Sequence, residues 1–483
     1  MHTLGPVEAR TAPRRSPRGE RLRGLVVPLA GAAVMAGTVA FGLLAKGSGD
    51  SLGSEQPPLL YNWDWHASAL ALLAVAVLGA AVAIAPRLRS LSLSPPTFAA
   101  AALVLGLVLR LAVGAARDGT GGWYAVYDVP NKESSNEYLP ALPAFDSGAR
   151  FFLDTFAEIG TALPVHAIGH PPGLLLTLHA LGIDTAEGMA ALTIGIGALS
   201  IPLVYVLGRQ LLDEAQARIA TLLYAFAPSA VLHGVTSADA LFATLAMLAL
   251  AALLAGRGGS RRGAVSPSGT IGLQSGAVSP FDGGGLQRGP VRPFDGIIAA
   301  VGPPALALAS FFSYANLAVG ALAAIVTLRR DGLRRALALS AACAAALLAF
   351  YGVLHLLTGF DPVGALRSTE IVYREGVASN RPYAFWVFGS PVAFLLAAGV
   401  PLAWLALRAL GARETVAVAL FSVVAISAVL GFTKAETERI YLFLVPCLCL
   451  AAATTLPRRY LTPVLGLLAL QAIATELLFE TVW

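Results

Sequence analysis

Long apolar runs recur along the whole chain, and they constrain its fold more than any other feature of the sequence. Hydrophobic residues make up 57% of the 483 residues and charged residues only 13%, far from the composition of soluble domains. A helix that crosses a bilayer needs about 20 mainly apolar residues. The sequence therefore predicts an all-α polytopic membrane protein.

About thirteen runs have the composition of membrane spans, and some are near the lower length limit of about 17 residues. The predicted spans are residues 24–45, 68–85, 97–115, 188–207, 215–233, 239–255, 296–313, 315–328, 334–354, 391–409, 415–431, 440–456 and 461–480. Residues 171–183 are apolar but too short to cross. We expect that segment to dip into the membrane from the outer side.

Basic residues predict the orientation, because short loops rich in Lys and Arg stay in the cytoplasm. Six basic segments are predicted to lie in the cytoplasm: residues 86–91, 208–218, 257–262, 329–335, 408–414 and 457–460. The outer segments hold most carboxylates, Trp and Tyr, and are residues 46–67, 116–187, 234–238, 314, 355–390 and 432–439. The net charge of +5 is thus an orientation signal rather than a sign of nucleic-acid binding. We expect a multi-pass protein of the cell membrane with a cytoplasmic N-terminus.

Four parts follow along the chain: a basic cytoplasmic tail (1–23), two additional N-terminal spans (24–96), a core (97–456) and a C-terminal span (457–483). The core includes the outer loops 116–187 and 355–390 and a cytoplasmic linker, 257–295. A thirteen-residue repeat in residues 263–296 predicts flexibility. An inert expansion is favoured there over a regulatory role. Cys343, Cys447 and Cys449 lie in apolar runs without a metal-binding spacing, so disulfides are not indicated.

Polar residues are costly in a membrane protein, so outer clusters of them are candidates for function. Residues 145–159 have helical spacing, with an apolar stripe opposite Asp146, Arg150, Asp154 and Glu158. Asp146 opens this predicted interfacial helix. Its carboxylate is either an N-cap, which the periodicity favours, or a general base.

Three more clusters fall on the outer side. Residues 166–173, HAIGHPPG, mark a helix start, where His170 is a capping side chain or a donor to an anion. Asp239 begins a span and is either solvated or turned inward. Residues 431–446 bring Lys434, Glu436, Glu438 and Arg439 to the side where basic residues are unusual. A bound phosphate explains those cations, and the alternative is a Glu–Arg surface pair.

The outer loop 355–390 adds mixed charges and aromatic residues, which suit either a lid over a polar site or an ordinary solvated loop. These residues are Arg367, Glu370, Tyr373, Arg374, Glu375, Arg381 and Tyr383.

The order of these elements resembles a known family. An acidic residue opens a helix, and an H-P-P-G helix start follows it. Next come a span that ends in GRQLL, a span that ends in APS, and Asp239. The later segment ETERIYLFLVP is similar to an E-x-R-Y-L-x-x-x-P element. In this order the chain resembles the membrane-embedded GT-C glycosyltransferases. The most similar branch is that of the protein O-mannosyltransferases, aminoarabinose transferases and similar actinobacterial-type integral membrane enzymes. The resemblance covers residues 97–456.

The resemblance implies transfer of a sugar from a polyprenyl-phosphate carrier to an acceptor hydroxyl on a glycan, lipid or protein, at the extracytoplasmic side. It implies that Asp146 acts as base or positions the acceptor, and that Asp239 is the second carboxylate. A divalent metal, Mg or Mn, is an optional cofactor that Asp146 and Asp239 would share. The expected substrate-binding residues are His166, His170, Arg150, Lys434, Glu436, Glu438, Arg439, Tyr441 and Arg374.

About thirty residues separate the first core span from the helix at residue 145, whereas the family has only a short connection there. Asp128, Glu133 and Glu137 lie in this insertion and are alternatives to Asp146. The competing functions are a transporter or lipid flippase, with ionisable residues at mid-membrane and paired halves, and a non-catalytic scaffold of the cell envelope. Residues 146, 170, 239 and 439 are predicted to meet in one outer pocket. No Gly-rich phosphate loop follows a strand pattern.

Overall fold

A computed structural model describes residues 17–255 and 293–481, with side chains from residue 24 and again from residue 300. The start of the basic tail and the thirteen-residue repeat up to residue 292 lie outside the described residues. The described chain is about 80% helical with almost no sheet, so the predicted all-α fold class is confirmed.

Most helices follow one another with short connections, but long segments separate α1 from α2 and α3 from α4. Those of the first half are α1 (Pro17–Gly47), α2 (Ala71–Ser90), α3 (Pro95–Gly114), α4 (Ala149–Ile159), α5 (Val165–Gly169), α6 (Gly173–Leu181), α7 (Ala186–Ala198), α8 (Ser200–Leu211), α9 (Glu214–Phe226), α10 (Pro228–Thr236) and α11 (Asp239–Leu254). Those of the second half are α12 (Pro293–Ser310), α13 (Leu317–Asp331), α14 (Leu333–Thr358), α15 (Pro362–Ile371), α16 (Tyr383–Ala398), α17 (Val400–Gly411), α18 (Thr415–Leu430), α19 (Thr437–Ile440), α20 (Val445–Thr455) and α21 (Leu461–Leu478).

Short elements fill the connections. They are η1 (Gly119–Trp123), η2 (Ala125–Tyr127), η3 (Lys132–Asn136), η4 (Leu139–Phe145), η5 (Gly160–Ala162), η6 (Tyr314–Asn316), the π-helical η7 (Val372–Val377), η8 (Tyr441–Leu444) and η9 (Arg458–Tyr460). Strands β1 (Asn62–Trp63) and β2 (Phe479–Glu480) pair antiparallel and join the segment after α1 to the C-terminal end.

The predicted count of about thirteen spans is not confirmed. Seven helices in the described chain are long and apolar enough to cross a bilayer, and nine if each bent pair forms one span. Three shorter apolar helices, Asp239–Leu254, Ala300–Ser310 and Thr415–Leu430, overlap other predicted spans. Helix α6 is one of the short helices, with nine residues, and is too short to cross, as expected.

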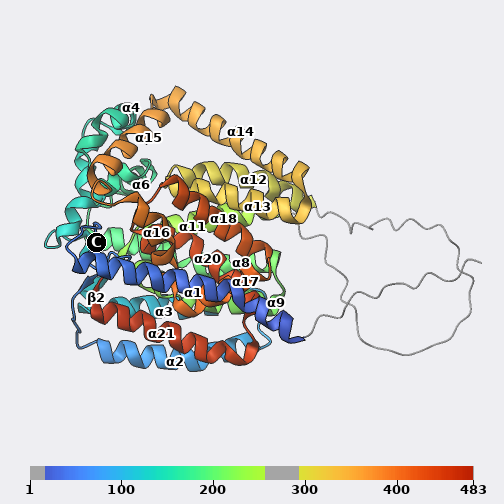
Figure 1. Cartoon of the computed structure of the whole chain (residues 1–483). Coiled ribbons are helices and arrows are strands. Elements are labelled where there is room, and N and C mark those ends of the chain that lie inside the picture. Colours follow the sequence, from blue (N-terminus) through green and yellow to red (C-terminus); the bar gives the residue numbers. More distant parts are fainter. Residues whose placement is uncertain (1–16, 256–292, 482–483) are drawn as a thin grey trace, which may run out of the picture.

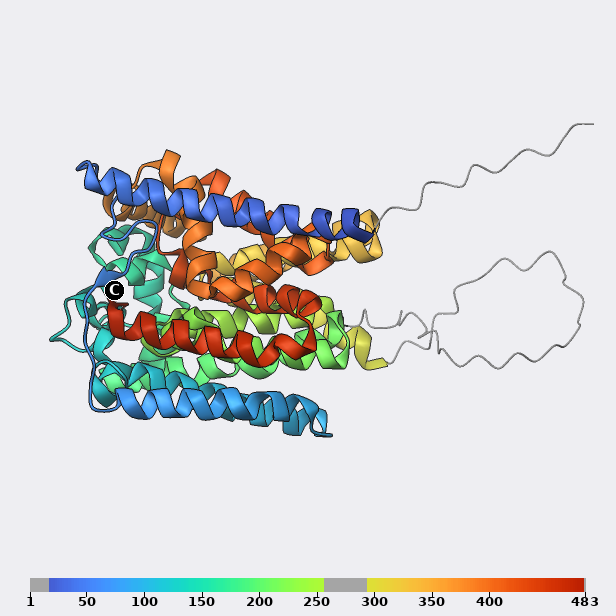
Figure 2. The same ribbon diagram turned by 60° about the horizontal axis from the view of Figure 1, so that its bottom comes forward.

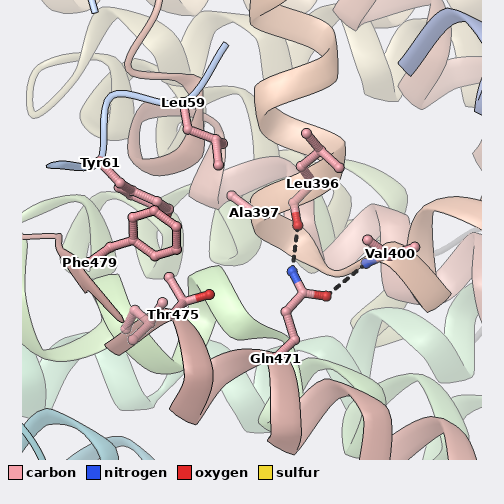
Figure 3. Close-up of a pocket in the computed structure, with 9 residues that line it drawn as sticks. Leu59, Tyr61, Leu396, Ala397, Val400, Gln471, Thr475 and Phe479 are labelled. Atoms are coloured by element: carbon pink, nitrogen blue, oxygen red, sulfur yellow. Dashed lines mark hydrogen bonds between the residues drawn. The ribbon is translucent and has the colours of Figure 1, made fainter. Parts of the chain in front are cut away.

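The predicted span 391–409 is not one straight helix, because α16 and α17 meet at 116°. Gly399 separates them with a φ of +127°, a backbone conformation that favours glycine. Gln471 on α21 spans the break: its amide donates to the Leu396 carbonyl at 2.7 Å and accepts from the Val400 N–H at 3.0 Å. Figure 3 shows this amide between the two helix ends. A second bend, of 55°, separates α9 from α10.

The helices form a bundle with two distinct ends (Figures 1 and 2). At one end the segments predicted to be outside contact one another: Ser368 Oγ donates to the Ala157 carbonyl at 2.7 Å, and Arg117 pairs with Asp64. We call this the outer end. At the other end, Arg218 donates to the Leu91 carbonyl at 2.9 Å. The predicted sidedness therefore describes a coherent bundle.

A separate layer covers the outer end, where Figure 1 shows α4, α6 and α15 together. Phe152 and Phe156 on α4 are fully buried, as the predicted apolar stripe requires. The helix begins at Ala149, however, and its N-cap is Gly148 with a φ of +92°. The expectation that Asp146 caps this helix is therefore wrong, because the chain turns at Gly148 and leaves Asp146 at the end of η4.

Candidate functional site

A buried ion pair joins Asp239 to Arg439 at the outer end of the bundle. Asp239 is the first residue of α11, and its Oδ2 accepts a hydrogen bond from Ser237 Oγ at 2.8 Å. Arg439 Nε lies 3.4 Å from the same oxygen. Asp239 is 9% exposed and Arg439 6%. The carboxylate thus turns inward, which was one of two alternatives for Asp239, and it fixes the position of the guanidinium.

Two further charged residues extend this pair. Arg439 Nη2 lies 3.5 Å from Glu436, and the other oxygen of Glu436 lies 2.7 Å from Arg381 Nη1. Side chains of Asp239, Arg439, Glu436 and Arg381 thus form a line of alternating charge, which we call the charge cluster. All four are at most 12% exposed. The alternative of a Glu–Arg surface pair therefore does not describe this segment.

The backbone before Arg439 adopts an unusual conformation. Ala435 and Glu436 have φ values of +66° and +59°, which L-residues with a Cβ avoid at a cost of about 1 kcal/mol each. Ser390 on α16 holds this turn, accepting from the Ala435 N–H at 3.1 Å while its carbonyl accepts from the Thr437 hydroxyl at 2.6 Å. This unusual turn brings Glu436 and Arg439 to the same side as Asp239.

His166 links the charge cluster to Glu137. Arg439 Nη2 lies 3.4 Å from His166 Nδ1, and His166 Nε2 lies 3.8 Å from Glu137 Oε1. Burial lowers the pKa of His166 well below its usual value, and the neighbouring Arg439 lowers it further. His166 is therefore neutral near pH 7, and Glu137 belongs to the site.

His170 lies beside the cluster without an ion pair. Its ring lies 4.8 Å from that of Phe242 and 6.2 Å from that of Tyr138. Burial lowers the pKa of His170 to about 4, against an opposing effect of Asp239. Its buried Nδ1 has no hydrogen-bond partner within the described residues. As a neutral ring, His170 contributes a hydrogen bond rather than a charge to any anion.

The segment between α1 and α2 passes over this site, and we call residues 48–66 the strap. The Leu60 N–H donates to Glu438 Oε1 at 2.7 Å, and the Tyr61 hydroxyl lies 3.2 Å from His233 Nε2. The Leu52 carbonyl accepts from the Trp386 indole at 2.9 Å. Sequence reasoning missed Tyr61 and His233, although the aromatic YNWDWH segment and a histidine within a span were both visible signals.

The structure does not bring every predicted residue to this cluster. Asp146 is exposed and lines a separate open pocket of about 440 Å³ with Pro140, Phe151 and Pro164. Arg150 is exposed too. Arg374 pairs with Glu370 at 2.8 Å, and both side chains are 56% exposed. Of the four residues predicted to share a pocket, Asp239 and Arg439 are in contact, His170 is adjacent, and Asp146 lies elsewhere.

Three other predicted residues have distinct surroundings. Tyr441 is 4% exposed and its hydroxyl bonds to Ser427 and Thr433, so its ring is part of the packing of α18. Asp128 is half-buried in a turn, where its carbonyl accepts from the Asn131 N–H. Lys434 is half-buried next to the charge cluster, and no carboxylate of the described chain lies within ion-pair distance of its ammonium.

The expected metal does not fit this arrangement. Over residues 17–255 and 293–481, no group of three or more His, Cys, Asp or Glu side chains is placed to hold a metal ion. Asp239 is already paired with Arg439, whose charge opposes a second cation, and Asp146 is not beside it.

A small apolar pocket of about 150 Å³ adjoins the strap (Figure 3). Tyr61 and Phe479 form one wall, and Leu396 and Val400 line it at the helix break. It contains no charged side chain, so the chemistry of the site belongs to the charge cluster.

The fold and this site together define a class: a helical membrane protein with buried ionised side chains gathered at one end of an apolar bundle. No family model, curated protein or solved structure matches the chain.

Proposed function

We propose that this chain is a glycosyltransferase that moves a sugar from a polyprenyl-phosphate donor to an acceptor hydroxyl at the outer face of the cell membrane. The observation that carries the proposal is the charge cluster, Asp239, Arg439, Glu436 and Arg381, buried at the outer end of an apolar bundle. Burying charges in a membrane protein is costly, so such a group is more readily explained by function than by stability.

The geometry suits a phosphate that is delivered from the bilayer. A prenyl carrier is itself apolar, so its phosphate reaches the interface without a soluble nucleotide-binding fold. Arg439 carries the donor fork that matches phosphate oxygens, and Asp239 and Glu436 hold it in one orientation. Lys434 adds a cation that no carboxylate of the described residues neutralises.

The reaction requires little covalent chemistry from the protein. The acceptor oxygen forms a bond to the anomeric carbon, the bond from that carbon to the phosphate oxygen breaks, and the carrier phosphate leaves with the electron pair. The acceptor hydroxyl loses its proton, for which Asp239 beside Arg439 is the proposed acceptor. Orientation and charge stabilisation supply the rest of the acceleration.

Release of the free carrier tests this proposal. Purified protein in lipid vesicles is incubated with a panel of prenyl-phosphate sugars and with glycan, lipid and peptide acceptors. We expect one donor to release polyprenyl phosphate only when an acceptor is present. No release with any donor and acceptor, from protein that is folded by thermal unfolding, would falsify the assignment.

A pair of cation variants locates the donor site. Lys434→Ala should raise KM for the donor about tenfold with a smaller change in kcat, because it removes a phosphate contact and no ion pair. Arg367→Ala is the matched control, since Arg367 is an exposed cation on α15. Arg439→Ala should also weaken donor binding, but it leaves Asp239 buried without its cation and Glu436 paired with Arg381 alone.

One observation favours a transporter or flippase instead. Arg110 lies within α3, is 2% exposed, and contacts Ser200 Oγ at 3.3 Å, with no carboxylate of the described chain in ion-pair range. Buried charges within spans are typical of transport pathways. Movement of a labelled prenyl-phosphate sugar across vesicles without release of its carrier identifies this second function.

A further inference from the structure

We propose that Glu137 is a neutral carboxylic acid that donates a hydrogen bond to a phosphate oxygen of the donor. This inference rests on the proposed function and adds one residue and one protonation state to it.

Glu137 follows η3 and points into the protein. It is 2% exposed, and His166 Nε2 lies 3.8 Å from its Oε1. Its second oxygen, Oε2, is fully buried and has no hydrogen-bond partner within the described residues. Buried polar atoms are nearly always paired, so Oε2 needs a partner from outside the described residues, and we assign that place to the donor phosphate.

Arg439 determines which nitrogen of His166 carries the hydrogen. A guanidinium only donates hydrogen bonds, so His166 Nδ1, at 3.4 Å from Arg439 Nη2, must be the acceptor. The hydrogen of the neutral ring is then on Nε2, which faces Glu137 Oε1. At 3.8 Å this N–H is too far from Oε1 for a full hydrogen bond, and the neutral ring gives Glu137 no ion pair.

These surroundings stabilise an ionised carboxylate poorly, because it is buried without a cation of the described chain in contact. They accommodate the neutral acid at a much lower cost. The titratable and charged groups around it are Tyr127, Tyr138, Glu133, Asp239, Arg439 and His166. Burial raises the pKa of Glu137 to about 8; Arg439 opposes this shift, while Asp239 and Glu133 add to it. The carboxyl is therefore protonated near pH 7, with the hydrogen on Oε2, because Oε1 is the oxygen that faces the His166 N–H.

A buried O–H needs an acceptor, and a ligand oxygen can supply it. A phosphate oxygen satisfies it best, because the same anion is attracted by Arg439 and Lys434, and its negative charge further favours the protonated form of Glu137. An ionised Glu137 would instead repel the phosphate. Glu137 thus makes donor binding depend on pH.

Infrared spectroscopy tests the protonation state without any ligand. The difference spectrum of wild type minus Glu137→Gln should contain the carbonyl band of a carboxylic acid at about pH 7, and that band should disappear as the pH rises through about 8. Glu158→Gln, on the exposed face of α4, is the matched control and should give no such band. A carboxylate band in place of the acid band at about pH 7 overturns the proposal.

Binding of a short polyprenyl monophosphate tests the role. Between about pH 7 and pH 9 the wild-type affinity should fall on the order of tenfold as Glu137 ionises, whereas the phosphate monoester changes its charge little. Glu137→Gln, whose amide still donates, should keep its affinity at both pH values, and Glu137→Ala should be weak at both. The corresponding prenyl alcohol controls for binding through the apolar chain.

The outcomes separate the two proposals. A wild-type affinity that does not change with pH, or a Gln variant as weak as the Ala variant, overturns the role of Glu137 and leaves the transferase proposal standing. Wild-type protein that binds the phosphate no better than the alcohol refutes the donor site itself, and with it the ligand assigned to Glu137.

Discussion

A buried ion pair limits what the side chain of Asp239 can do. Its Oδ2 is occupied by Ser237 and Arg439, so the charge of Asp239 both orients the guanidinium and makes the site polar. Asp146 has the same functional group on an exposed turn, without contact to the cluster. The two carboxylates therefore differ in environment rather than in chemistry.

We expect Asp239→Asn to reduce kcat for carrier release on the order of a hundredfold, because the amide keeps the shape but neither accepts the proton nor balances Arg439. Asp146→Asn is the matched control and should retain most of the activity. The measurement is carrier release at saturating donor by both variants in the same vesicles. A reversed ranking would restore Asp146 as the base that the family resemblance implied.

Glu137 also couples stability to pH. The folded protein holds a proton on Glu137 up to a pKa of about 8, whereas the unfolded chain releases it near 4.5. The unfolded state binds fewer protons between these values, so this contribution to stability is lost as the pH rises from about 4.5 to 8 and stays constant above. The Glu137→Gln variant lacks this pH-dependent contribution to stability, because its amide does not titrate.

The unfolding temperature of Glu137→Gln relative to wild type should therefore increase across that range. His166 and His170 stay neutral in the folded protein over this range, so their contributions come from the unfolded chain and cancel in the difference. Parallel unfolding curves at a series of pH values provide the measurement. A difference that is constant from about pH 5 to 8 contradicts the raised pKa of Glu137.

Part of this site could be predicted from the sequence. Lys434, Glu436, Glu438 and Arg439 stood out because cations on the outer side of a span need a partner, and Asp239 because it begins an apolar run. The position of Asp146 was misjudged because helical periodicity appeared to continue back to Phe145, although the glycine at 148 ends it. Glu137 meets His166 through irregular turns, which have no period to detect.

At the scale of elements, a helix break shapes the region beside the site. Helices α16 and α17 diverge at Gly399. Gln471 of α21 hydrogen-bonds to the Leu396 carbonyl and the Val400 N–H on the two sides of the break (Figure 3). Membrane segments need such replacements, because no water satisfies backbone groups in the apolar core. A hydropathy window of fixed length averages over a break of this kind, which is why the predicted span 391–409 crossed it.

Gln471→Leu should therefore destabilise the protein by about 1 to 2 kcal/mol, since the Val400 N–H loses its partner and the Leu396 carbonyl keeps only the Gly399 N–H. Leu470→Ala is the control on the same helix, because Leu470 is 62% exposed and touches no part of the break. Unfolding of both variants in one detergent measures the difference. Equal stabilities would mean that Gln471 does not hold the break.

The strap gives a role to the two additional N-terminal spans. Sequence reasoning found no function for them, because the contacts of the strap lie hundreds of positions away: Leu60 with Glu438, and Leu52 with Trp386. Strand β1 also pairs with β2 at the C-terminal end. Helices α1 and α2 thus anchor a segment that closes the outer side of the site.

At the scale of the whole molecule, the charge of the connections agrees with how they group at the two ends of the bundle. The alternation of basic and acidic loops sorted the connections into two groups, and each group meets at one end of the bundle (Figure 2). The number of spans was less predictable, because bends and short apolar helices give the same hydropathy as straight spans. The side on which a loop lies depends on the total charge of that loop, which the sequence gives directly. The number of spans depends on where helices bend or end, which hydropathy does not give.

Labelling of single cysteines in intact cells tests that sidedness. Ser135→Cys lies in the outer group and Ala412→Cys in the inner group, and both positions are exposed. The three native cysteines are buried, so background labelling should be low. We expect a membrane-impermeant thiol reagent to label residue 135 directly and residue 412 only after the membrane is permeabilised, because the basic loops around residue 412 stay in the cytoplasm. Labelling in the opposite order would place the charge cluster at the cytoplasmic face, where an outer-face transferase could not act.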